Sequence, residues 1–377
     1  MVFVMYSKNK CISLILWAIL LYSNVSACDI PYEKPFTVYW NVPSYVCQRH
    51  GIYINASQFG IIQNTDDTFH GDKIDINYHP GRFPYLLGNF PVNGGIPQRG
   101  CMLDHATIFK NQVESMPKDF SGLAVLDFEY YLPSFYSAPR AYKKASREWI
   151  TFLHPNWTTE DIEAEVVETF NNSTKKLMEV VLHLANKLRP NAKWGYYHYP
   201  YCKNREGKFN CTDNMLALND EMVTWLYNES KALYPSIYVQ KGKGFDDLGR
   251  RNMAMGRINE ALRIRHQLQK NIPIYTYFRG LYKDTDEYLE TLDILNTMGV
   301  SRLAGIDGTI IWGRSDDVSS PEKCAALKQN LETSLGPLVQ DIITRNMSHL
   351  RRLFRTYKIQ KKLEENNLPK TEKWISF

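Results

Sequence analysis

The sequence lacks the short motifs that mark several common enzyme classes. Its 377 residues contain no GxGxxG or GxxxxGK[ST] turn, no GxSxG elbow, and no CxxC or HExxH pattern. These absences argue against an open nucleotide-binding sheet, an α/β serine hydrolase and a zinc site. The excess of basic over acidic residues, 45 to 40, is too small to indicate a nucleic-acid-binding protein. No motif implies a metal or an organic cofactor, and we expect none.

Long apolar runs are also missing, apart from one near the start. That run, Cys11 to Tyr22, is shorter than the roughly 18 residues of a membrane-spanning helix. Lys8 and Lys10 precede it and the small residues Val25-Ser26-Ala27 follow it, which is the pattern of a signal peptide over residues 1–27. An uncleaved anchor is the alternative. Cleavage lowers the net charge from +5 to +3. Because no later run is long enough to span a membrane, we expect a secreted, soluble protein without membrane association.

Cysteines and glycosylation motifs fit an exported chain. Six cysteines remain after the predicted signal peptide, an even number that indicates disulfides but leaves fifteen connectivities open. A local bridge between Cys202 and Cys211, around the polar segment KNREGKFN, is the favoured single pair. Acceptor motifs for N-linked glycans occur at Asn55, Asn156, Asn171, Asn172, Asn210, Asn228 and Asn346.

Short strand-like runs alternate with helical patterns along the chain, without internal repeats. Strands are predicted at 36–42, 74–78, 123–130, 194–199, 236–239, 272–278 and 308–312, and helices at 159–187, 253–268 and 286–298. Such alternation is typical of parallel strands with crossover helices. Because the first strand is followed by Asn41-Val42-Pro43 rather than a glycine-rich turn, we predict a distorted (β/α) TIM-like barrel over 28–344. The basic tail, 345–377, is either a solvated helix, a frayed end or a contact for a polyanion.

Two carboxylates follow an apolar strand in the run Leu123-Ala-Val-Leu-Asp127-Phe-Glu129. Residues two apart on a strand share a face, and two acids so close resist ionising together. One of them is then expected to keep its proton near neutral pH, as glycosidic bond cleavage requires. The alternative is a pair of ordinary strand-end acids that cap a loop or form salt bridges.

Aromatic residues end several other predicted strands. Packing is the better explanation of any single one of these rings, but Tyr197, Tyr238 and Trp312 taken together favour the wall of a sugar-binding groove. His198, within the Tyr-rich run, is the one histidine whose position draws attention, and a packing role is the simpler interpretation.

These segments together resemble the animal hyaluronidases, and are most similar to the insect venom and salivary type. The resemblance rests on GLAVLDFE, WGYYHYPYC, YPSIY and GTIIWG in this order, with YWNVPSYVC, GDKI, NDEM and LGPLV in support, and covers about 36–343. It implies a distorted barrel that hydrolyses β-1,4 N-acetylglucosaminide bonds of hyaluronan, with some action on chondroitin. It also implies a substrate-assisted, retaining mechanism. We expect a monomeric enzyme that binds a glycosaminoglycan.

The resemblance also implies residue roles and disulfides. Glu129 would be the acid that protonates the leaving oxygen and later activates water, and Asp127 would orient the acetamido N–H. Tyr238 would hydrogen-bond the acetamido oxygen, Trp312 would back the N-acetyl group, and Tyr197 would line the same subsite. The implied bridges are Cys47–Cys324 and Cys202–Cys211, and a third between Cys28 and Cys101 stays open.

The chain departs from the family pattern at two places on the expected cleft rim. Tyr131-Leu132-Pro133 stands where the family has Trp-Arg-Pro, and Arg314-Ser315 stands where it has paired serines. Tyr131, Arg314 and Ser315 are accordingly candidate substrate-binding residues, with Arg314 replacing the lost positive charge. The alternative function is a catalytically weak or inactive secreted glycoprotein that binds glycan.

Overall fold

The computed structural model describes residues 34–204, 207–242 and 245–367. Contacts divide the chain into two units, 1–35 and 36–377, and all described strands and helices belong to the second. The predicted signal peptide, 1–27, lies outside the described residues. The division at residues 28–344 and 345–377 stays a prediction.

Parallel strands form two sheets. The strands are rich in hydrophobic residues, and polar or aromatic residues stand at their ends. The first has the order β2 (Ile62–Gln63), β1 (Thr37–Asn41), β9 (Gly308–Trp312) and β8 (Tyr275–Phe278). The second has the order β3 (Ile74–Tyr78), β6 (Leu123–Asp127) and β7 (Lys193–Tyr196). A separate antiparallel hairpin pairs β4 (Tyr85–Leu87) with β5 (Phe90–Val92).

The segment 233–236 joins the two sheets along one side. Parallel bridges pair Tyr197 with Tyr234, Leu233 with Ile274, and Ser236 with Tyr277. The strand predicted at 236–239 is therefore wrong as a regular element, because the pairing begins earlier and consists of isolated bridges. Pro235 lies within the segment and has no N–H to donate to a ladder.

One buried amide side chain joins the two sheets along the other side. Asn64, directly after β2, donates from Nδ2 to the Ile74 carbonyl at 2.9 Å and to the Thr68 carbonyl at 2.8 Å. Its Oδ1 accepts from the backbone N–H groups of Lys73 at 2.8 Å and Ile74 at 3.0 Å. Gly71 permits this approach, since a Cβ there would lie 2.4 Å from Asn64 Cγ. The strands are thereby linked into the predicted distorted barrel.

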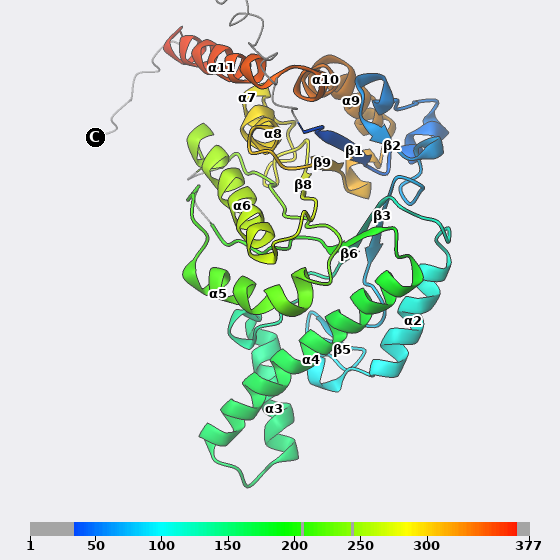
Figure 1. The fold of residues 1–377 in the computed structure, drawn as a ribbon, viewed down its shortest axis with the longest axis vertical. Helices are drawn as coiled ribbons and strands as arrows, with labels where there is room; N and C mark the ends of the chain where they lie inside the picture. The colour runs from blue at the N-terminus through cyan, green and yellow to red at the C-terminus, as the bar shows by residue number, and fades with distance from the viewer. Residues whose placement is uncertain (1–33, 205–206, 243–244, 368–377) are drawn as a thin grey trace, which may run out of the picture. The chain divides into compact units, whose positions relative to one another are not determined.

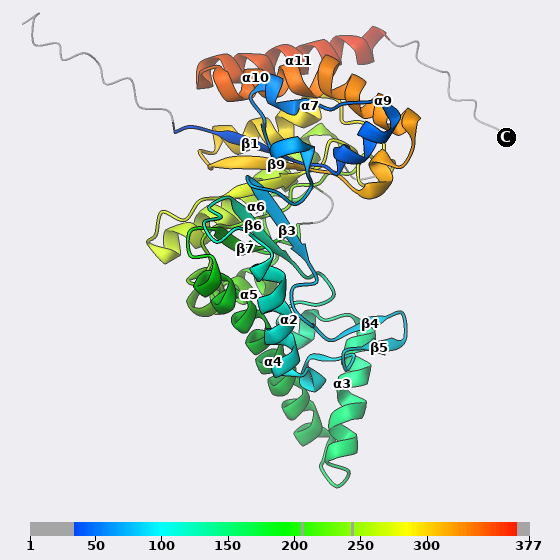
Figure 2. The ribbon, with the colours of Figure 1, turned by 90° about the vertical axis from the view of Figure 1, so that its right-hand side faces the viewer.

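Helices follow most strands and cover the barrel. They are α2 (Met102–Glu114), α3 (Arg140–Leu153), α4 (Thr159–Leu188), α5 (Asp213–Met222), α6 (Asp247–Leu268), α7 (Thr291–Ile294), α8 (Val300–Leu303), α9 (Pro321–Asn330), α10 (Gly336–Thr344) and α11 (Met347–Asn367). In Figure 1 and Figure 2, α2 and α3 lie beside α4, and the β4–β5 hairpin lies beside α3. A hydrogen bond of 2.8 Å from Leu86 N to the Tyr142 hydroxyl holds the hairpin there.

The predicted helices agree with the structure to different degrees. The helix predicted at 159–187 is α4, which begins after Thr158, whose side chain accepts from Asp161 N. The helix predicted at 253–268 begins earlier, after the capping residue Asp246. The one predicted at 286–298 is wrong at both ends. It begins at Thr291 and continues through a π-helical turn to Leu303, because Asp286 has φ +55° and pairs with two arginines instead of starting a helix.

Two disulfides are present among the described residues. Cys47, after β1, is bonded to Cys324 on α9, and Cys202 is bonded to Cys211 around the loop that follows β7. These are the two pairs that the family resemblance implied. Cys101 is exposed and has no disulfide partner among the described residues. Cys28 lies outside the described residues, so a third bridge stays a prediction.

The C-terminal segment contains a helix with two unlike faces. Leu350 is fully buried and Phe354 packs beside Gly299, whereas the basic side chains of the helix face solvent. These exposed cations are Arg351, Arg352, Arg355, Lys358 and Lys362. Residues 347–362 of the predicted tail therefore form a helix that packs on the protein with one face and is solvated on the other. In the described part of the chain, no helix is both long and apolar enough to cross a bilayer.

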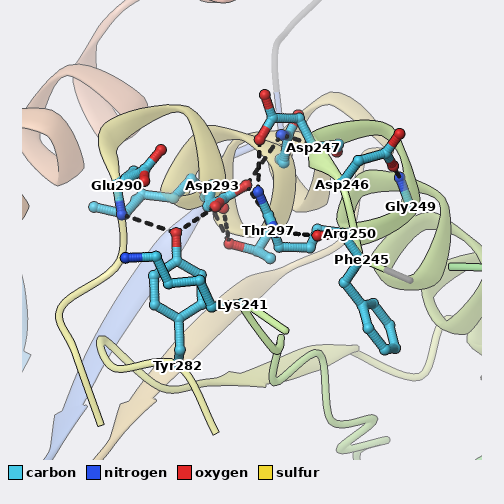
Figure 3. Close-up of polar contacts among 12 residues, drawn as sticks. Lys241, Phe245, Asp246, Asp247, Gly249, Arg250, Tyr282, Glu290, Asp293 and Thr297 are labelled. Carbon is cyan, nitrogen blue, oxygen red and sulfur yellow. Dashed lines mark hydrogen bonds and ion pairs between the residues drawn. The ribbon is translucent and has the colours of Figure 1, made fainter. Parts of the chain in front are cut away.

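A buried ion pair connects α6 to α7 (Figure 3). Arg250 Nε lies 2.8 Å from Asp293 Oδ1, and the two side chains are 7% and 0% exposed. The Tyr282 hydroxyl donates to the other Asp293 oxygen, and Asp247 pairs with Arg250 at 2.6 Å. Lys361 of α11 pairs with Asp247 at 2.9 Å, so the same cluster holds the C-terminal helix.

We predict that Asp293→Asn destabilises the fold by about 1–3 kcal/mol, because it removes the buried carboxylate beside Arg250 and leaves the partly exposed Asp247 as its remaining ion-pair partner. Urea unfolding of the variant and the parent measures this loss. Glu332→Gln, which breaks an exposed pair with Lys328, is the control and should cost under about 1 kcal/mol. An equal, small loss in both variants would contradict a stabilising role for the cluster.

Candidate active site

The carboxyl ends of the parallel strands meet at one rim and enclose a cavity of about 230 Å³. Asp127 is the last residue of β6 and Trp312 the last of β9, while Tyr197 follows β7 directly. Because these ends lie together in a barrel, residues far apart in the sequence become neighbours. Of the predicted site residues the rim brings together Asp127, Glu129, Tyr197, Tyr238, Trp312 and Arg314.

The two acidic residues occupy unlike environments. Glu129 has a side chain that is 58% exposed, whereas Asp127 Oδ1 is buried and has no hydrogen-bond partner among the described residues. Burial, and after it the charge of Glu129, raises the pKa of Asp127 to about 8. Asp127 therefore holds a proton at neutral pH. This agrees with the expectation that the two acids do not ionise together.

An aromatic wall faces the acidic pair. The rings of Tyr238 and Trp312 are stacked with centroids 5.7 Å apart, and Tyr197 lies 6.3 Å from Tyr238. Trp312 Nε1 donates to the hydroxyl of Tyr78 at 2.8 Å. Burial raises the pKa of Tyr78 to about 12 and that of Tyr238 well above its usual value, so both phenols stay protonated. Such a wall offers flat apolar faces together with hydroxyl groups, which suits a sugar ring.

Tyr78 is a site residue that the sequence reasoning missed. It is the last residue of β3 and pairs in register with Asp127. The signal that could have identified it is the one used for Trp312, an aromatic residue at the end of a predicted strand.

Arg314 lines the cavity but is already engaged by carboxylates. Its Nη2 lies 2.8 Å from Asp286 Oδ2, and its Nε lies 3.6 Å from Asp317 Oδ1. The buried Arg279 pairs with the same two carboxylates at 2.9 and 2.6 Å. Two arginines thus share two aspartates, so the charge of Arg314 is partly compensated before any ligand binds.

Tyr131 and Ser315 lie away from the cavity lining. Tyr131 is 3% exposed, its hydroxyl donates to the Pro84 carbonyl at 2.8 Å, and its ring packs against Phe128 and Phe170. It is a core residue, so the expected substrate contact of this side chain has no support. Ser315 is exposed at the start of a short helical turn outside the cavity lining.

A second cavity, of about 490 Å³, adjoins the first. The two share Glu129, Tyr197, Tyr238 and Lys283, so Glu129 stands at their junction. The residues that line only the second cavity include His198, Lys203 and Arg257. With Lys283 these give the cavity a strongly cationic wall, which suits a carboxylate or another anion. Lys203, Arg257 and Lys283 were missed, because no local pattern distinguishes them from surface cations.

The predicted glycan acceptors are distributed over the surface. Six of the seven asparagines are exposed; Asn171 is only partly exposed, and its Oδ1 accepts from Phe135 N at 2.7 Å. The exposed ones are Asn55, Asn156, Asn172, Asn210, Asn228 and Asn346.

Comparison with known proteins gives consistent results. The hyaluronidase family profile matches residues 26–350. Hyaluronidase B of Vespa velutina is 37% identical over 325 residues, which cover 82% of this chain and 97% of that protein. Hyaluronidase of Apis mellifera is 36% identical over 332 residues, covering 83% and 86%.

The structure resembles solved structures of the same kind. The crystal structure of bee venom hyaluronidase is similar with a TM-score of 0.76 at 35% identity, covering 81% of this chain and 99% of that one. The structure of that enzyme in complex with a hyaluronic acid tetramer gives a TM-score of 0.77. The distorted-barrel fold predicted from the sequence is confirmed.

The buried carboxyl of Asp127 predicts how stability depends on pH. An unfolded chain loses this proton at about pH 4, whereas the folded protein keeps it to about pH 8. Between these values the folded state binds more protons, so its stability falls as pH rises. The variant Asp127→Asn has no ionisable carboxyl group at this position, so it does not show this fall in stability.

Urea unfolding from about pH 4.5 to about pH 7.5 checks this linkage. We expect the free energy of unfolding of the variant, relative to that of the parent, to increase with rising pH by on the order of a few kcal/mol over the range. Exposed Asp119→Asn is the control, for which we expect a constant difference. A constant difference for Asp127→Asn too would show that Asp127 ionises normally.

Proposed function

The chain belongs to the hyaluronidase family and is a glycoside hydrolase, and from that premise we propose that Glu129 and Asp127 carry a substrate-assisted, retaining cleavage of β-1,4 bonds within hyaluronan. The observation that carries the proposal is the unlike pair of acids. One is exposed at the junction of two cavities, and the other is buried with an unpaired oxygen beside an aromatic wall.

In the first step the substrate's own 2-acetamido oxygen attacks the anomeric carbon. Glu129 donates its proton to the glycosidic oxygen, so the C–O bond breaks and the leaving sugar departs as an alcohol. The Tyr238 hydroxyl donates to the acetamido group, and Trp312 supports its methyl face. In the second step the Glu129 carboxylate takes a proton from water as the water oxygen attacks the anomeric carbon. The bond from that carbon to the acetamido oxygen breaks, which restores the acetamido group and gives a product with retained configuration.

Asp127 assists by accepting the acetamido N–H on its unpaired Oδ1. A hydrogen bond to the carboxylate favours the charged form, and so does the positive charge that develops on the oxazolinium ring. Both lower the pKa of Asp127 when substrate is bound. Asp127 then releases its resting proton to solvent as the acetamido N–H takes its place, so the carboxylate forms only when substrate is present.

The cationic second cavity supports a polyanionic substrate. Lys203, Arg257 and Lys283 line it next to Glu129. In the proposed complex the hyaluronan chain would continue past the cleaved bond along these side chains. Glucuronate carboxylates of hyaluronan, or those of chondroitin, would meet these cations. We propose that the protein acts as a secreted monomer on extracellular glycosaminoglycan, without nucleic-acid or membrane partners.

A weakly active glycan-binding homologue is the second candidate. The observation that favours it is the rim: Leu132 packs against the core where the family has an arginine, and Arg314 is paired with two carboxylates. This candidate predicts binding without turnover.

We expect Glu129→Gln to abolish the loss of viscosity of high-molecular-weight hyaluronan, with at least a roughly hundredfold fall in rate, because no acid remains to protonate the leaving oxygen. Unfolding and binding of hyaluronan oligosaccharides should stay unchanged. Glu148→Gln, at an exposed position on α3, is the control. Turnover that persists in Glu129→Gln would refute the assigned role, and a parent protein without turnover would favour the second candidate.

We expect Arg314→Ser to raise the KM for hyaluronan about tenfold while kcat changes little, if the guanidinium contacts a substrate carboxylate as a charge-assisted donor. Steady-state kinetics at low and moderate salt measure the effect, which should shrink as salt rises. Arg345→Ser, which removes an exposed arginine paired with Asp341, is the matched control. An unchanged KM would assign Arg314 to the Asp286–Asp317 pairing alone.

A further inference from the structure

His198 lines the second cavity, and the proposed mechanism leaves it without a role. Its Nδ1 lies 3.8 Å from Glu129 Oε2, within ion-pair range but longer than a hydrogen bond. Its side chain is 24% exposed, against 58% for Glu129. The imidazole is thus a titratable neighbour of Glu129, the residue that would move the proton, on the side of the second cavity.

The backbone holds His198 in an unusual conformation. Its φ of +73° lies in the left-handed region, which is uncommon for a residue with a side chain. The N–H of His198 donates to the Tyr234 carbonyl at 2.9 Å, and its ring lies 4.7 Å from that of Tyr201. These contacts fix the ring beside Glu129. Residues kept in costly conformations tend to occur where their placement matters for function.

We propose that His198 is a positioning residue that sets the pH range over which Glu129 can donate its proton, by pairing with the Glu129 carboxylate once the imidazole is charged. The inference rests on the proposed function, since it takes Glu129 as the acid. It adds an ionisable imidazole to the two carboxyl groups of the site, Asp127 and Glu129, and gives the chain its own determinant of pH dependence.

The groups around His198 determine the direction of the effect. Burial lowers the pKa of His198, the nearby Glu129 opposes this, and the cations Arg257 and Lys283 lower it further. Lys203 and the phenols of Tyr197, Tyr201 and Tyr238 complete the titratable groups lining the cavity. Glu129 is the one acidic residue among the described lining residues, so the imidazolium has a single carboxylate to pair with.

A charged imidazole 3.8 Å away favours the carboxylate form of Glu129 over the protonated acid that cleavage needs. The two groups titrate as a coupled pair, so kinetics report apparent values of the pair. Removing the imidazole should move the basic limb of the kcat/KM profile toward higher pH.

The kinetic test compares pH profiles of kcat/KM on hyaluronan oligosaccharides for the parent, His198→Asn and His198→Lys. Asparagine tolerates the left-handed backbone and carries no charge, so we expect its basic limb to shift upward by about one pH unit. His198→Lys restores a permanent charge and should return the limb to the parent position or below it. His79→Asn makes the same substitution at another histidine with positive φ, and should leave the limb in place.

Superimposable profiles for the parent and His198→Asn would overturn the proposal, as would an equal shift in His79→Asn. A second measurement does not depend on turnover. The NMR titration of the His198 imidazole, assigned by its absence from His198→Asn, should have a lower midpoint in Glu129→Gln than in the parent, because a negative neighbour is removed. An unchanged midpoint would overturn the coupling. Persistent hydrolysis by Glu129→Gln would overturn only the proposed function.

Discussion

The closure of the barrel by the Asn64 side chain is the constraint on which the remaining structure depends. A single buried amide makes five hydrogen bonds to the backbone between Thr68 and Ile74, where a strand ladder is missing. Because a buried backbone group without a partner is costly, this amide lets two separate sheets share one core. Closure in turn brings the carboxyl ends of β3, β6, β7 and β9 to one rim, where Asp127 and the aromatic wall meet.

That rim separates two carboxyl groups that are only two residues apart. Asp127 ends a strand whose other side chains are buried, and it loses most of its contact with water, whereas Glu129 projects into the space shared by two cavities. Burial, reinforced by the charge of Glu129, holds a proton on Asp127 in the free protein, whereas Glu129 stays open to solvent and substrate. An enzyme that borrows its nucleophile from the substrate needs only one protein group to move a proton, and Glu129 is placed to be that group in the proposed mechanism.

Sequence patterns succeeded where the signal was local and failed where distant groups intervened. The strands at 74–78 and 308–312 have their predicted bounds, since alternation and strand length are encoded within a few residues. The sequence pattern predicts a helix start at Asp286, but Arg279 and Arg314 hold it in a turn. It also predicts a ligand contact at Tyr131, but the hydroxyl of this residue reaches the Pro84 carbonyl inside the core. In both cases the deciding partner lies far away in the sequence or in another element.

The sequence by itself determined the family, the barrel and the identity of the acidic and aromatic residues, because these depend on motifs and on residue order. The tertiary structure alone decided which acid is buried, that Arg314 is shared between two aspartates, and that His198 lies beside Glu129. It also gathered Lys203, Arg257 and Lys283 on one wall from three separate parts of the chain. Charge and solvation act through space, so their effect on a site follows from distances and burial that only the folded chain defines.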